Sequence, residues 1–200
     1  MSLPGEMQHQ DATFPHSWRA QVLTRPPLIL PSRQFMFPLQ VPGEEDALNR
    51  GALLIEVRPA AGGAFLATCA LGFQEPSLPT GLWTCPAPDD LLGVAGGYAY
   101  CIRTADPART EFLPLRPVCS VVPCPQHGLL LLAGFHTVLA LGAEGVRWQT
   151  ARLSWEGLTL GEIEGNSLHG TGWDMFLDRN VPFRVDLLTG KHKGGGYTGR

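Results

Sequence analysis

Apolar residues recur at every second position along several short stretches of the chain. The alternation runs from Leu53 to Val57 and again from Phe183 to Leu187, with more polar residues such as Glu56 and Arg184 in between. A period of two is typical of a β-strand with one buried face. Residues 129–133 are apolar without a break, which is typical of a strand buried on both faces. These stretches predict short strands packed on a core.

Glycine-rich turns separate the apolar stretches and predict antiparallel hairpins. One hairpin is predicted from strands at 51–58 and 64–71, with Gly62 and Gly63 as the turn, and a second over residues 136–151 with its turn at 142–145. Consecutive hairpins of this kind make an antiparallel meander.

A change of phase predicts an irregularity in one later strand. Leu158 and Leu160 share one face, whereas Ile163 is displaced from that phase by one residue, and Gly161 lies at the slip. An extra residue in one strand of a pair produces this shift, so we expect a β-bulge at Gly161.

Long helices are excluded by the frequency of glycine and proline. The longest stretch without either residue, Val146 to Glu156, has eleven residues, and each such breaker inside a helix costs about 1–3 kcal/mol. The best helical candidate is the short segment 44–50. We therefore predict an all-β protein with at most one or two short helices, more than a third of its residues in strands and less than a tenth in helix.

Proline density divides the chain into three parts. Residues 1–43 contain seven prolines together with many apolar residues. Because proline has no N–H to donate to a central strand, we expect this part to be an extended segment that packs on the domain and buries its aromatic side chains. Residues 44–193 are predicted to form a single β domain, and residues 194–200 a flexible glycine-rich tail.

Charge and hydrophobicity argue against two classes of partner. The formal net charge is −3 and only 16% of residues are charged, which is unlike the basic surface that binds nucleic acid. The longest apolar run, Leu129 to Ala133, is five residues, whereas a membrane-spanning helix needs about 20. We predict that the chain binds neither nucleic acid nor membrane.

The cysteines indicate a reducing compartment. The five cysteines are odd in number and widely spaced, no Cys-x-x-Cys pair is present, and the N-terminus lacks the features of a signal peptide. We expect five reduced thiols, no disulfide and a cytoplasmic location.

A possible repeat connects the later hairpins. Three apolar segments end on Gly96, Gly134 and Gly172, which are spaced by 38 residues. The spacing favours either repeated units, each of strand, turn and strand, or an ordinary meander in which the interval is coincidental.

The middle unit resembles a blade of a quinoprotein-type β-propeller. After the strand and glycine turn at 128–134 come Val138 to Leu141, a turn at 142–145 and a strand that carries Trp148, and residues 185–191 of the third unit resemble the same pattern. The resemblance implies blade-like repeats. Three units are fewer than the four that close a propeller, so it implies an incomplete propeller-like arrangement, a sandwich or a barrel. The whole chain also resembles small bacterial all-β proteins, which implies no activity.

Motifs for cofactors and metals are missing from the sequence. Gly194 to Gly196 is not followed by a helix that could receive a phosphate, and no pair of histidines has metal-ligand spacing. Cys124, His127 and His136 could form part of a metal site, but they are more typical of a solvated turn and a strand surface. We predict no cofactor and no metal.

The richest polar and aromatic stretch is the candidate ligand-binding site. It comprises Trp155, Glu156, His169, Trp173 and Asp174. Tryptophan and acidic residues beside glycine turns are frequent at binding sites of β folds, and they are also frequent as buried anchors of loops.

Two functions remain open at this stage. The absence of catalytic motifs favours a non-enzymatic binding or interaction module, whose partner is a protein or a second copy of the chain. The alternative is a small hydrolase-like enzyme that uses Glu156, His169 and Asp174, which would have to converge in one concavity.

Residues 173–180 are predicted to be an insertion between two strands. The apolar residues Met175, Phe176 and Leu177 lie there between polar ones. We expect this loop either to fold back on its own domain or to contact a partner.

Overall fold

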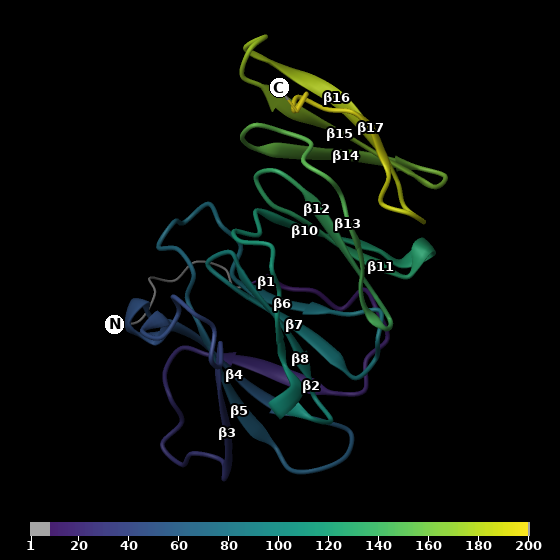
Figure 1. The fold of residues 1–200 in the computed structure, drawn as a ribbon. Helices are drawn as coiled ribbons and strands as arrows, with labels where there is room; N and C mark the ends of the chain where they lie inside the picture. The colour runs from purple at the N-terminus through teal and green to yellow at the C-terminus, as the bar shows by residue number, and fades with distance from the viewer. Residues whose placement is uncertain (1–8, 200) are drawn as a thin grey trace. The chain divides into compact units, whose positions relative to one another are not determined.

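The computed structural model describes residues 9–199 (Figure 1). It confirms the predicted all-β class, since 46% of the residues are in strands and 5% in helix. The helical residues form three short 3-10 turns: η1 (Ala47–Arg50), η2 (Pro107–Arg109) and η3 (Pro125–His127). Within the described residues no helix is long and apolar enough to cross a membrane.

Contacts divide the chain into two compact units, one up to Pro117 and one from Val118 on. The domain boundaries predicted from the sequence remain predictions. Each unit contains two small sheets, and none of the four sheets closes into a barrel.

The first unit is built from two sheets that share a hydrophobic core. One has the order β2-β4-β5-β3 and the other β1-β6-β7-β8-β9. Their strands are β1 (His9–Gln10), β2 (Arg19–Leu23), β3 (Arg33–Phe37), β4 (Ala52–Arg58), β5 (Phe65–Ala70), β6 (Gly81–Thr84), β7 (Asp90–Ala95), β8 (Tyr98–Arg103) and β9 (Glu111–Phe112). The core includes Ile55, Phe65 and Tyr100.

The proline-rich segment packs along this unit. β2 and β3 occupy the two edges of one sheet and β1 pairs with the edge strand β6 of the other, as expected for a segment whose prolines exclude it from central positions. Its aromatic side chains Phe14, Trp18 and Phe37 are buried.

The second unit consists of two four-stranded antiparallel meanders, β10-β11-β12-β13 and β14-β15-β16-β17. Their strands are β10 (Ser120–Cys124), β11 (Leu129–Ala133), β12 (Val138–Gly142), β13 (Gly145–Gln149), β14 (Leu158–Glu164), β15 (Ser167–Asp174), β16 (Arg179–Asp186) and β17 (His192–Gly194). Leu131, Trp148, Leu168 and Phe183 contribute to the core between the two sheets.

The predicted bulge in β14 is present. The pairing with β15 slips between Leu160 and Ile163, so that two residues of β14 lie opposite His169. The slip returns Ile163 to the core side, where it packs with Leu158 and Leu160.

Three local predictions need correction. Only Ala47–Arg50 of the segment 44–50 is helical. Glu44 lies before this turn, and its carboxylate accepts hydrogen bonds from the Tyr98 hydroxyl and from Arg50 Nη2, the latter at 2.6 Å. Residues 173–180 are not an insertion, since β15 runs to Asp174 and β16 begins at Arg179, which leaves a four-residue turn.

The third correction concerns the 38-residue spacing. Gly96 and Gly134 each follow the last residue of a strand, whereas Gly172 lies inside β15. The third unit therefore has a different register from the first two.

The C-terminal segment makes contacts as far as Tyr197. The Gly195 N–H donates to the Pro182 carbonyl at 2.9 Å and the Tyr197 N–H to the Leu153 carbonyl at 3.3 Å. These bonds hold the end of the chain against the β14–β17 sheet.

Candidate functional site

The β14–β17 sheet has one face on the core and one face open. Along β15 the residues with even numbers, such as Leu168 and Asp174, are more buried than His169, Thr171 and Trp173. Since side chains alternate across a strand, the last three share the outer face. Two of the five predicted site residues, His169 and Trp173, therefore point away from the core.

A shallow groove lies at one end of this sheet. It has a volume of about 370 Å³ and is lined by Glu156, Gly157, Leu158, Thr159, Trp173 and Asn180. Trp173 and Asn180 are paired across β15 and β16. The groove thus brings together Glu156 and Trp173, which the sequence had suggested as site residues.

Ser154 positions both of these residues. Its hydroxyl Oγ accepts the N–H of Trp173 at 2.8 Å and the N–H of Glu156 at 3.2 Å, and its side chain is fully buried. Sequence reasoning missed Ser154, because nothing in the local pattern shows that it pairs with a strand 19 residues away.

Trp155 belongs to an aromatic cluster beside the groove. Its ring meets those of Phe176 and Tyr197 edge to face, with centroids 5.6 and 4.8 Å apart. The Arg152 guanidinium lies 5.0 Å from the Trp155 ring centroid and 4.7 Å from that of Tyr197. Trp155 is thus an anchor for the C-terminal segment, and sequence reasoning did not identify Arg152 or Tyr197.

His169 and Asp174 do not meet. They are five residues apart on one strand and on opposite faces, which separates their Cα atoms by about 16 Å. His169 Nε2 lies 3.7 Å from Glu164 Oε2. The buried Asp174 carboxylate accepts the N–H groups of Phe176 and Leu177 at 2.8 and 3.1 Å. Asp174 therefore anchors the turn, and the constellation needed for a hydrolase-like site is not assembled.

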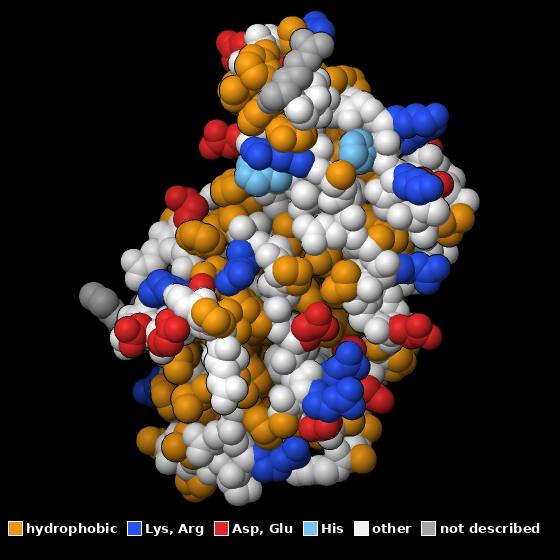
Figure 2. Space-filling model, viewed as in Figure 1, with side chains coloured by type: hydrophobic (Ala, Val, Ile, Leu, Met, Phe, Trp, Pro, Cys, Tyr) orange, Lys and Arg blue, Asp and Glu red, His pale blue; other side chains and the backbone are white. Residues whose placement is uncertain are grey.

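The turn that Asp174 anchors presents three apolar side chains to solvent. Met175, Phe176 and Leu177 are 44%, 61% and 56% exposed. In the view of Figure 2, apolar side chains come to the surface over this end of the β15–β16 hairpin. The tip and the groove share one end of the sheet.

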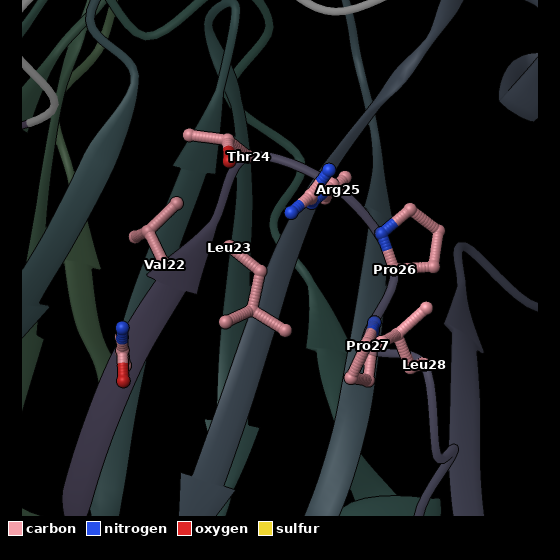
Figure 3. A pocket seen from close by; sticks show the side chains of 8 residues that line it. Val22, Leu23, Thr24, Arg25, Pro26, Pro27 and Leu28 are labelled. Carbon is pink, nitrogen blue, oxygen red and sulfur yellow. The ribbon is translucent and has the colours of Figure 1, made fainter.

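A second hollow lies in the first unit. It measures about 390 Å³ and is lined by residues 21–28, between the end of β2 and the segment that follows it (Figure 3). Arg25 is the one charged residue of its lining. No predicted site residue lies there.

Cys124, His127 and His136 do not form a metal site. Within the described part of the chain no group of three His, Cys, Asp or Glu side chains is close enough to hold a metal ion. No disulfide joins the five cysteines, all of which lie in that part.

No model of a known protein family matches the chain, and a comparison with curated proteins finds no match.

Proposed function

We propose that the chain is a non-enzymatic interaction module that binds a second copy of itself through one end of the β14–β17 sheet. This docking end comprises Glu156, Trp173, the tip at 175–177, Arg179 and Asn180. The observation that carries the proposal is the exposed apolar tip beside an open groove. Apolar side chains rimmed by polar ones are typical of a surface that contacts another protein.

Symmetry supports a second copy as the partner. In a two-fold dimer both subunits use the same surface. If one part of that surface in the first copy contacts a second part in the other copy, the reverse contact forms as well. The tip and the groove lie side by side, since Trp173 is next to the last residue of β15 and Met175 begins the turn that follows. A two-fold axis between them would let the tip of each copy enter the groove of the other.

Charge supports the same pairing. Glu156 and Arg179 are both exposed, and neither forms an ion pair with another residue of the described chain. Glu156 lines the groove and Arg179 adjoins the tip. Two-fold docking would bring Arg179 of one copy to Glu156 of the other, and such complementarity favours the correct orientation.

A charge exchange tests the proposal by sedimentation velocity over a wide range of concentrations. We expect the wild-type chain to dimerise, Arg179→Glu to weaken the dimer, and the double variant Arg179→Glu with Glu156→Arg to restore it. Arg184→Glu, an exposed position on β16 farther from the tip, is the matched control and should leave the dimer unchanged. A wild-type chain that stays monomeric, or a double variant that is no stronger than the single one, would contradict the proposal.

We also propose blade-like repeats within the fold and a reducing location for the chain. Three consecutive antiparallel meanders, β6–β9 (a sheet to which β1 adds a fifth strand), β10–β13 and β14–β17, support blade-like repeats of the quinoprotein type. The absence of a disulfide among the cysteines supports a reducing location such as the cytoplasm.

A further inference from the structure

Three polar side chains of the second unit form a connected relay away from the docking end. The Cys124 thiol lies 3.2 Å from His127 Nδ1, and His127 Nε2 lies 3.1 Å from Asn166 Oδ1. The amide oxygen of Asn166 only accepts, so Nε2 carries the ring proton and Nδ1 is the acceptor for the thiol. A thiol, a base and a group that orients the base, in this order, is the arrangement that activates nucleophilic cysteines.

The local sequence explains the geometry. Pro125 begins the 3-10 turn η3 and Gly128 ends it in the left-handed conformation, with φ of 59°. This tight turn folds His127 back over Cys124, three residues earlier. Asn166 lies in the β14–β15 turn, and its carbonyl accepts the Leu187 N–H at 2.8 Å, so its backbone is held in place by the turn that follows β16.

The thiol lies just beneath the surface. Cys124 is only 1% exposed, but the residues that follow it, Pro125 and Gln126, are exposed, as is Gly128. A side chain added at Gly128 would meet no atom within 4 Å. Because the thiol is buried in the core cluster of the second unit, a reagent that reaches it beside the exposed turn η3 has to be small.

We propose that Cys124 is a base-assisted thiol that reacts with small hydroperoxides, with His127 as the base and Asn166 as its positioning residue. The thiol proton moves to His127 Nδ1 while the sulfur attacks the distal oxygen of the hydroperoxide. The O–O bond breaks, and the departing alkoxide takes the proton from Nδ1. Cysteine is oxidised to sulfenic acid and the hydroperoxide is reduced to the alcohol, or to water in the case of hydrogen peroxide.

The electrostatics around the sulfur require such a base. Burial raises the pKa of the Cys124 thiol, and the His127 backbone N–H lowers it in part. The resting group is therefore the thiol, and its proton needs an acceptor at the moment of reaction. His127 is the titratable group that faces it. Next to the β14–β15 turn, whose Asn166 contacts His127, the last residue of β14, Glu164, is paired with His169.

Competition among the five cysteines tests the proposal in one sample. The native chain is treated with hydrogen peroxide, sulfenic acids are trapped with dimedone, and each cysteine is followed by peptide mass spectrometry. Cys119 is more exposed than Cys124, and Cys69 is fully buried with a pKa raised by burial alone. We expect Cys124 to react about tenfold or more faster than either. Rates that follow exposure, with Cys119 first, would overturn the proposal.

The pH profile separates a base from a merely structural histidine. In the wild-type chain we expect the Cys124 rate to rise at a lower pH than ionisation of the buried thiol alone would give, because the neutral imidazole of His127 accepts the thiol proton. In His127→Ala that rise should disappear, so that the rate increases only as the thiol itself ionises. Asn166→Ala should lower the rate and keep the rise. A wild-type profile without this rise would contradict the relay even if the variants failed to fold. Neither the competition among the cysteines nor the pH profile depends on dimerisation of the chain.

Discussion

The two sheets of the second unit have the same strand order and opposite surface character. In the β10–β13 sheet, every residue of β11 is buried, and so are all of β12 except Gly142. In the β14–β17 sheet, buried and more exposed residues alternate along β15, and β14 has no buried residue at all. The sequences explain the contrast, since β11 is Leu-Leu-Leu-Leu-Ala and β15 is Ser-Leu-His-Gly-Thr-Gly-Trp-Asp.

This difference shows that one topology can serve as a scaffold or as a binding surface. A strand that is apolar on both faces has no face left for a partner. A strand with one apolar face packs on the core and leaves its other face for polar and aromatic groups. We therefore assign stability to the first sheet and recognition to the end of the second.

The largest expected effect is a difference in stability between substitutions in the two sheets. Leu131 is completely buried in β11, and Leu131→Ala should destabilise the chain by roughly 2–5 kcal/mol through lost contacts and a cavity. Thr171→Ala, on the outer face of β15, should change stability by about 0.5 kcal/mol or less. Urea unfolding measures both. Equal losses at the two positions would remove the distinction between scaffold and surface.

A smaller effect is expected where the core face of β15 needs glycine. A Cβ at Gly172 would lie 2.6 Å from the Leu153 carbonyl oxygen, so Gly172→Ala should cost about 1–3 kcal/mol. Gly142 is the matched control in the other sheet, since the nearest atoms to a Cβ there would be those of Arg147, at 3.7 Å, and the Gly145 carbonyl oxygen, at 3.9 Å, which are ordinary contacts. Thermal unfolding measures the stability of both variants. If Gly172→Ala were as stable as the wild type, the close packing at this position would be contradicted.

A still smaller loss of stability is expected when the hydrogen bond that links the two sheets is removed. The buried Trp148 of β13 donates its Nε1–H to the Leu187 carbonyl at 2.8 Å. Trp148→Phe keeps an aromatic ring and removes this donor, so it should cost about 1–2 kcal/mol. Trp148→Phe that is as stable as the wild type in urea unfolding would show that this bond does not hold the sheets together.

Much of the fold could be predicted from local patterns. The bulge near Gly161 followed from the phase of Leu158, Leu160 and Ile163, because a period of two records which face is buried. The buried β11 followed from an unbroken apolar run. The meander followed from glycine turns, whose positions are set by nearby residues.

The candidate site could be predicted from the sequence only in part. Glu156 and Trp173 do line one groove, but His169 and Asp174 are held apart by the alternation of a strand that sequence reasoning had shortened. Ser154, Asn166 and Tyr197 act through partners 19 to 42 residues away. Pairings of this kind depend on sheet register, which a single sequence does not display.

Substitution of Phe176 tests the central claim, recognition at the exposed tip, most directly. Phe176 is 61% exposed, and among the described residues its ring meets that of Trp155, at 5.6 Å between centroids. Urea unfolding and sedimentation velocity of Phe176→Ser should together show stability within about 0.5 kcal/mol of the wild type and a clearly weaker dimer. A loss of roughly 2–4 kcal/mol, as for a buried aromatic, or a dimer of unchanged strength, would contradict the account.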